Sequence, residues 1–163
     1  MSTAATTHLP TPLQVRELLS GLLGREVTLS PGSPMAPRPG DAVSIATYVD
    51  DALVVRATIT CDLALSAALG CAIALLPAPQ VAEAVEANAV DETLADNLYE
   101  VLNVLAATFN VPDAPHVRLH ALHPAIGAPP PDARARVLAL GRREDLRVEV
   151  PGYGEGRLSV VLA

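Results

Sequence analysis

Asp96, Glu100 and Asn103 are polar residues at helical spacing, and together they can hold a partner and position a water molecule. They belong to the segment 91–110, DETLADNLYEVLNVLAATFN. At about 100° per residue, the three side chains fall within roughly 60° of one another on a helix. A carboxylate one turn before an asparagine, on an open helix face, is an arrangement suited to both tasks.

The other side of this segment is apolar and indicates how the polar side is held. Glu92 joins the polar side, and the small residue Ala107 follows Asn103 one turn later. Apolar residues recur every three or four positions, as in a helix packed on a core. They are Leu94, Leu98, Val101, Leu102, Leu105 and Phe109. We therefore expect an amphipathic helix that begins after Asp91, a typical N-cap residue.

Length and composition limit the class of protein. The chain has 163 residues, about the length of one domain. Half of its residues are hydrophobic but only 2% are aromatic, so the core must be aliphatic. A net charge of −7 argues against nucleic acid or an anionic membrane as a partner. No apolar run reaches the ~18 residues of a membrane span, and the first residues do not resemble a signal peptide. We expect a cytoplasmic protein.

The order of predicted elements favours an α+β domain. Residues 1–10 are predicted to form a flexible N-terminal tail, and residues 11–163 a single domain. Helices are predicted at 12–23, 63–69, 81–88 and 91–109, strands at 43–49, 53–59, 116–122, 137–140, 146–150 and 158–162, and a loop at 31–40. This order predicts one antiparallel or mixed sheet with helices packed on one face. Cys61 and Cys71 are expected to be reduced core residues.

The run Asp96-Asn-Leu-Tyr-Glu100-Val-Leu-Asn103 resembles the signature of the CheC/CheX/FliY family of response-regulator phosphatases. That signature has Asp or Ser, then Glu four residues on, then Asn three residues later. A proline follows roughly two dozen residues beyond, and here Pro124 stands twenty-one residues after Asn103. CheX-like members are also similar in length and in the order of their elements. The resemblance implies the pseudo-duplicated CheC-like or CheX-like architecture, with one site per chain as in CheX.

The resemblance also implies a reaction, which is hydrolysis of the aspartyl phosphate on a CheY-like receiver domain. Placement and charge stabilisation dominate such phosphoryl transfer. Asn103 would orient the attacking water, and Glu100 would dock the receiver through its lysine. Asp96, Glu92 and Ala107 would contact the same partner. The receiver would supply Mg²⁺, so neither a cofactor nor a metal site is expected in this chain, and a homodimer is expected.

Two features depart from the family pattern. Family members usually have glycine or another small residue before the asparagine, whereas this chain has Leu102. That side chain either crowds a receiver or turns into the core. Members with two sites carry a second motif on an earlier helix. Here the first predicted helix offers Glu17 and Ser20, with serine in place of the asparagine.

Three functions stay open at this point. The first is the receiver phosphatase. The second is a catalytically inactive CheX-like module that binds a receiver or dimerises in a two-component or chemotaxis-type pathway. The third is a small acidic scaffold whose late strands pair with another subunit.

Other motifs in the chain favour structural interpretations. His116, His120 and His123 alternate with apolar residues in a predicted strand, which places His120 and His123 on opposite faces. The glycine-rich segment 151–156 precedes a strand rather than a helix, so it predicts a hairpin turn and not a nucleotide loop. A cluster of arginines, interleaved with acids, predicts a solvated sheet edge. These are Arg134, Arg136, Arg142, Arg143 and Arg147.

Overall fold

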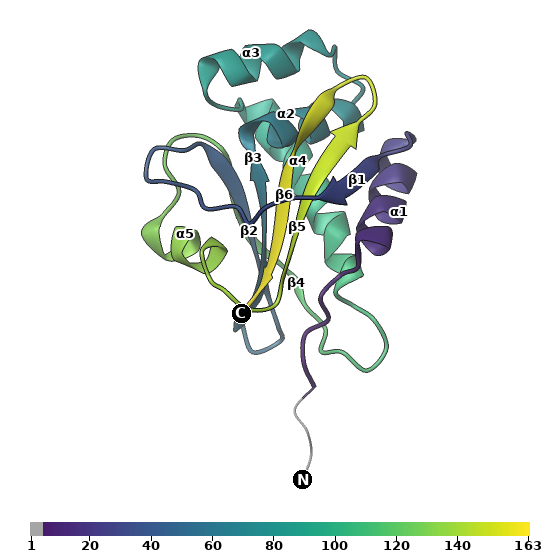
Figure 1. Ribbon diagram of the computed structural model, residues 1–163, viewed down its shortest axis with the longest axis vertical. Helices are drawn as coiled ribbons and strands as arrows, with labels where there is room; N and C mark the ends of the chain where they lie inside the picture. The colour runs from purple at the N-terminus through teal and green to yellow at the C-terminus, as the bar shows by residue number, and fades with distance from the viewer. Residues whose placement is uncertain (1–4) are drawn as a thin grey trace.

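A computed structural model describes residues 5–163, which form one sheet covered by helices (Figure 1). The elements are α1 (Pro12–Leu23), β1 (Thr28–Pro31), β2 (Val43–Val49), β3 (Val55–Asp62), α2 (Leu63–Ile73), α3 (Pro79–Ala87), α4 (Glu92–Leu105), a 3₁₀ turn (Ala106–Thr108), β4 (Arg118–His123), α5 (Pro131–Val137), β5 (Arg143–Val150) and β6 (Gly154–Leu162). All neighbouring strands are antiparallel, in the order β1-β5-β6-β3-β2-β4. The predicted α+β class is confirmed.

The two halves of the chain repeat one order of elements. The first set is α1, β1, β2 and β3, and the second is α4, β4, β5 and β6, with α5 inserted after β4. The hairpins β2–β3 and β5–β6 meet at the β3–β6 pairing in the middle of the sheet. The first strand of each set crosses to the hairpin of the other, because β1 pairs with β5 and β4 pairs with β2. α1 and α4 are therefore equivalent helices in a pseudo-duplicated architecture.

Capping residues determine where the helices of the covered face begin. Thr11, Asp62 and Asp91 each accept a hydrogen bond from the backbone N–H three residues further on. The side chain of Gln14 accepts from the N–H of Thr11 in return, which completes a capping box. α1 ends before Gly24, whose φ of 64° lies in the left-handed region that glycine adopts without strain. The predicted limits of α1 and the predicted start of α4 are confirmed.

The main core lies between the sheet and the helices α1, α2 and α4. α2 is buried on nearly every side, and Gly70 allows α4 to cross it closely. A Cβ atom at Gly70 would lie 2.8 Å from the carbonyl oxygen of Leu94. The side chain of Asn97 donates to the Gly70 carbonyl at 2.9 Å, which fixes the crossing further. Cys61 and Cys71 are buried and free, in agreement with their prediction as core residues.

The opposite face of the sheet is covered by α5 and by the loop 32–42. Met35, Val43, Ile45, Ala133 and Val137 form a separate apolar cluster there. The predicted strand 137–140 is wrong, because the chain is helical up to Val137 and irregular afterwards. Pro131 is compatible with the first turn of a helix. The guanidinium of Arg143 donates to the carbonyls of Val137 and Ala139, which a strand would have used.

The arginine cluster is only partly solvated, so that prediction is wrong for Arg143. The side chains of Arg143 and Asp145 are each 9% exposed, and they form an ion pair at 2.8 Å. Burial raises the pKa of Asp145, but hydrogen bonds from Arg143 and Ser159 outweigh it and lower that pKa overall. β5 is also not an edge strand, because β1 covers it. β1 itself was not predicted, since its four residues are too short to show a pattern.

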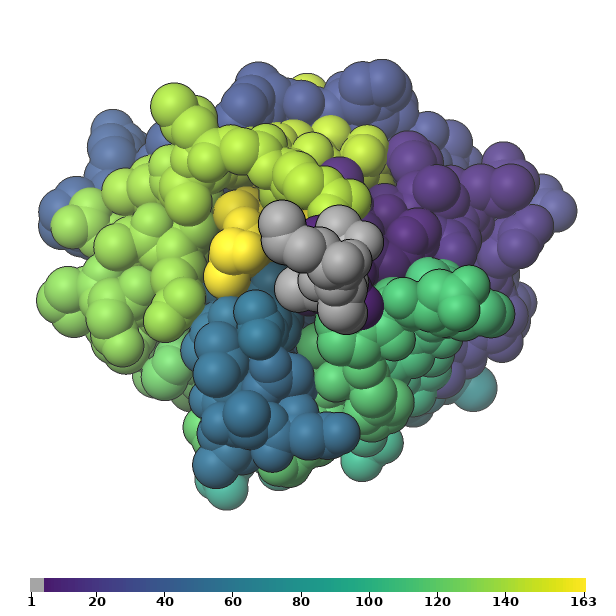
Figure 2. Space-filling model, turned by 90° about the horizontal axis from the view of Figure 1, so that it is seen from below, coloured from purple at the N-terminus to yellow at the C-terminus, as the bar shows by residue number. Residues whose placement is uncertain are grey.

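Figure 2 views the end of the molecule that carries the C-terminus, the β2–β3 turn and the segment after α5. Residues 1–4 of the predicted tail lie outside the described residues. Of the remaining tail, Pro10 is buried, and Nε2 of His8 lies 2.8 Å from Oε1 of Gln14.

Among residues 5–163, no helix combines the length and the hydropathy that a membrane span requires.

Candidate functional site

The residues that the sequence analysis assigned to the site lie on the outer side of α4 and of the 3₁₀ turn that follows it. Glu92, Asp96, Glu100, Asn103 and Ala107 are all exposed and follow one another along this side. Residues three or four positions apart are neighbours on a helix. Glu100 and Asn103 therefore project together into solvent, while their roles in binding and hydrolysis stay predictions.

The polar groups of this face are available to a partner. Within residues 5–163, no side-chain hydrogen bond or ion pair involves Asp96, Glu100 or Asn103. The core-facing asparagine of the same helix, Asn97, is by contrast bonded to the backbone of α2. The face is therefore not consumed by contacts that hold the fold together.

Leu102 turns into the core, which decides between its two possible orientations. Its side chain is 0% exposed and packs with the other apolar residues of α4. The shoulders of the polar face are formed instead by Tyr99 and Val104, which are 42% and 38% exposed. Sequence reasoning missed these two residues. Their signal was two large apolar residues at positions that flank Glu100 and Asn103 on the helical wheel.

A groove of about 390 Å³ lies beside the site, between α1 and the 3₁₀ turn that follows α4. Gln14, Glu17 and Leu18 form one wall, and Ala107 and Thr108 form the other. Because Ala107 lies one turn after Asn103, the groove continues the exposed face of α4 toward α1. A small residue at this position leaves room for a partner's backbone to approach.

The helix changes its winding directly after Asn103. The α-helix ends at Leu105 and tightens into the 3₁₀ turn Ala106–Thr108. The N–H of Ala106 donates to the carbonyl of Asn103, three residues back. The carbonyl of Leu102 accepts from the buried hydroxyl of Tyr48, with 2.6 Å between the two oxygens.

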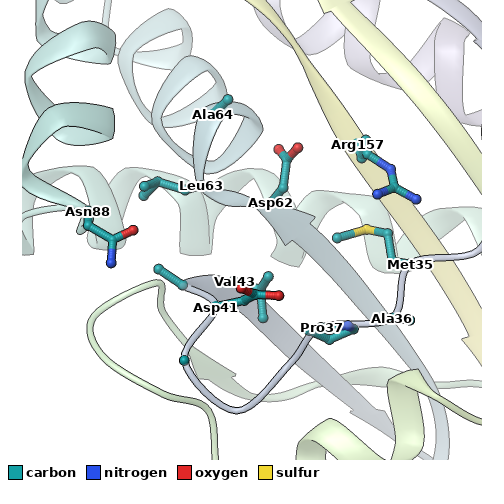
Figure 3. A pocket seen from close by; sticks show the side chains of 12 residues that line it. Met35, Ala36, Pro37, Asp41, Val43, Asp62, Leu63, Ala64, Asn88 and Arg157 are labelled. Carbon is teal, nitrogen blue, oxygen red and sulfur yellow. The ribbon is translucent and has the colours of Figure 1, made fainter.

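A second hollow, of about 500 Å³, lies away from α4, between the loop 32–42, the start of α2 and Asn88 (Figure 3). Asp62 caps α2 there, and burial raises the pKa of its carboxyl group. Arg157 donates to the carbonyl of Ser33, and Asp41 pairs with Arg38. Asp62 and Arg157 do not point toward one another in Figure 3. The polar groups of this hollow have structural roles, so we do not place the site there.

Two further motifs have structural outcomes. Residues 151–153 form the turn that joins β5 to β6, in agreement with the predicted hairpin. His120 and His123 lie on β4. In the part of the chain that the structure describes, no three His, Cys, Asp or Glu side chains form a group that could hold a metal ion.

The fold has relatives among solved structures, although no family model and no curated protein matches the chain. CheX from Borrelia burgdorferi, solved in complex with CheY, BeF₃ and Mg²⁺, gives a TM-score of 0.53 at 14% identity over 91% of this chain and 92% of that chain. FliY from Thermotoga maritima gives 0.55 at 12% identity over 91% and 82%. The FliM middle domain from Vibrio alginolyticus gives 0.56 at 13% identity over 90% and 84%. The protein therefore has the CheC/CheX/FliY-like fold that its α4 motif resembled.

Proposed function

We propose that the protein is a CheX-like phosphatase that accelerates hydrolysis of the aspartyl phosphate on a CheY-like receiver domain. One observation carries the proposal. The side chains of Glu100 and Asn103 are exposed, bond to none of the described residues and lie one turn apart on the outer side of α4 in a CheX-like fold. The complex of Borrelia burgdorferi CheX with CheY supports the receiver as the class of partner.

Asn103 is suited to orienting the attacking water. Its amide has both donors and an acceptor and carries no net charge. The side-chain oxygen accepts a hydrogen bond from the water, whose oxygen attacks phosphorus in line with the bond to the aspartyl oxygen. That bond breaks, and the products are inorganic phosphate and the free aspartate of the receiver. A carboxylate at position 103 would repel both the phosphoryl group and the attacking oxygen.

Glu100 serves docking in this proposal. Its carboxylate pairs with the lysine of the receiver's phosphorylation site and thereby sets the register of the two proteins. Asp96 and Glu92 extend the acidic side along α4, and Ala107 with the neighbouring groove accommodates the receiver's backbone. Charged groups arranged in this way mainly give specificity and speed of association. The receiver brings its own Mg²⁺, and both proteins would meet in the cytoplasm.

A receiver-binding module without hydrolysis is the second candidate. The same fold occurs in a FliM–SpeE complex from H. pylori, with a TM-score of 0.52 at 9% identity over 91% of this chain and 79% of that chain. The fold is therefore compatible with partners of different kinds. A homodimer is part of either proposal, and β1 and β4 are the strands at the sheet edges. In the scaffold hypothesis the late strands pair with another subunit. Among the described residues, β5 and β6 are already paired on both sides within the chain, which leaves β4 as the late strand with a free edge.

The decisive experiment measures the decay of phosphorylated receivers from the same organism, with and without the protein. We expect one receiver to lose its phosphate faster in the presence of the protein, and Asn103→Ala to abolish the acceleration. A pull-down with the beryllofluoride-activated receivers accompanies the assay. Binding without faster decay would establish the inactive module, and a protein that neither binds nor accelerates would refute both proposals.

A further inference from the structure

The carbonyl of Leu102 is the backbone group next to Asn103, and it has an unusual partner. In a regular α-helix it would accept from the N–H of Ala106. Here Ala106 donates to Asn103 instead, because the helix tightens to a 3₁₀ turn. The hydroxyl of Tyr48, from β2, takes the vacated place at 2.6 Å. The group is buried, so loss of this donor would leave an unsatisfied carbonyl in the core.

Both strands that pair with β2 are irregular beside Tyr48. Its pairing with β3 shifts between Tyr48 and Val49, where Arg56 is the extra residue. Its pairing with β4 shifts between Thr47 and Tyr48, where His120 is the extra residue. Both neighbours of β2 thus carry a bulge beside the same tyrosine. Bulges bend strands and re-aim side chains, and they are frequent next to functional sites.

The ring of Tyr48 is held firmly as well. It is 0% exposed, and its centroid lies 5.0 Å from that of Phe109, which follows the 3₁₀ turn. Burial raises the pKa of Tyr48 well above its ordinary value, with a smaller contribution from Cys61. The hydroxyl therefore keeps its proton at neutral pH and stays a hydrogen-bond donor.

The geometry points to Tyr48 as a positioning residue for Asn103, and this inference rests on the proposed phosphatase function. The hydroxyl of Tyr48 donates to the Leu102 carbonyl, which the tighter turn leaves without an N–H donor. Tyr48 thereby stabilises the 3₁₀ turn that follows Asn103. A 3₁₀ turn has 3.0 residues per turn instead of 3.6, so the winding sets the direction of Ala107 relative to Asn103. Tyr48 itself lies in the core and touches neither receiver nor water.

Tyr153→Phe is a matched control for Tyr48→Phe. The hydroxyl of Tyr153 also donates to a backbone carbonyl, that of Leu76 after α2, at 2.8 Å. Both substitutions remove one oxygen atom and one tyrosine–carbonyl hydrogen bond. Only the first lies under α4, so a general loss of stability would affect the two variants alike.

The experiment measures kcat and KM for the phosphorylated receiver, together with the backbone and side-chain amide NMR signals of residues 103–108. For Tyr48→Phe we expect kcat to fall at least about tenfold with KM little changed, because misplacing a positioned group slows chemistry rather than docking. The signals of Asn103, Ala106 and Ala107 should shift. Tyr153→Phe should leave both kcat and these signals as in the wild type.

Three results would overturn the inference. They are unchanged signals at Asn103 in Tyr48→Phe, shifted signals with an unchanged kcat, or an equal loss of kcat in both variants. A wild-type protein that acts on no receiver would refute the proposed function by itself. The NMR comparison then decides alone whether Tyr48 holds Asn103 in place.

Discussion

α1 and α4 occupy equivalent places in the two halves of the fold, yet only α4 has an available polar pair. Glu17 and Ser20 on α1 have the same spacing as Glu100 and Asn103 on α4. The hydroxyl of Ser20, however, accepts from the backbone N–H of Val27 at 3.1 Å. It helps to close the turn between α1 and β1, whereas the side chain of Asn103 is hydrogen-bonded to none of the residues 5–163.

The strands beneath α4 and α1 also differ, because within the described residues only the strand beneath α4 offers a side-chain hydrogen-bond donor to its helix. β2 offers the hydroxyl of Tyr48 to the backbone of α4. β5, its equivalent in the other half, turns Leu146, Val148 and Val150 into the core, and none of these side chains has a donor. α1 ends in a simple left-handed cap at Gly24. One half of the molecule thus carries the exposed polar pair with a buried hydroxyl beneath it, and among the described residues the other half carries neither.

The largest expected difference between the halves is in activity. Asn103→Ala should lower the rate of receiver dephosphorylation about 100-fold, because the water loses its orienting group. Ser20→Ala, its counterpart on α1, should leave the rate unchanged. The measurement is phosphoreceiver decay at saturating receiver, with circular dichroism to verify that both variants fold. Equal rates for the two variants would contradict the assignment of the site to α4.

Glycine-to-alanine substitutions should change the free energy of unfolding in opposite directions at the contact with α4 and on the outer side of α1. Gly70→Ala forces a methyl group against the backbone of Leu94 in α4 and should destabilise the protein by about 1–3 kcal/mol. Gly21→Ala, on the exposed side of α1, meets no atom within 4 Å. It should stabilise by about 0.5–1 kcal/mol through lower backbone entropy of the unfolded chain. Urea unfolding measures both, and a loss of stability in both variants would argue against an open outer side of α1.

Docking should depend on one carboxylate more than on the other. Glu100→Gln should raise KM for the phosphorylated receiver about tenfold, the loss expected for one charged hydrogen bond. Glu17→Gln, in the groove between the helices, should change KM by no more than about twofold, as exposed charges usually do. Steady-state kinetics at two salt concentrations separates the effects. A larger effect at Glu17 would move the docking centre to α1.

The smallest expected effect is that of placing the same pair of polar residues on α1. Ser20→Asn places a Glu–Asn pair of the right spacing on α1, and we expect it to restore no activity in an Asn103→Ala background. Position 20 is only partly exposed, and among residues 5–163 no tyrosine hydroxyl donates to the backbone of α1. Recovered receiver dephosphorylation would mean that spacing alone is sufficient and that the supporting residues are dispensable.

The sequence predicted the elements whose signals are local. The cap at Asp91, the apolar periodicity of 94–109 and the run 43–49 were enough to place α4 and β2. α5 was missed, because the prolines before it were interpreted as a separator between strands. The burial of Arg143 was missed although Asp145 is only two residues away, because the loop 32–42, which contacts this ion pair through Met35, is distant in sequence. The exposed face of α4 was predictable, since helical period alone places its residues.

The support of the site could not be predicted in the same way. Tyr48 is fifty-four residues away from Leu102 in sequence, and a tyrosine in an apolar strand suggests only a core residue. The two bulges beside it depend on the register of three strands, which no local pattern specifies. Long-range hydrogen bonds of this kind appear only once the chain has folded.

Because the two halves exchange their first strands, neither half of the chain can be removed without loss of strand pairing in the other. A chain cut between α3 and α4 would separate β1 from β5, β2 from β4 and β3 from β6, so each piece would have unpaired backbone along three strands. Contacts such as Thr28 with Glu149 span most of the sequence, which slows folding and ties it to the complete chain. The half without the polar pair is therefore needed for the half that carries the pair to fold.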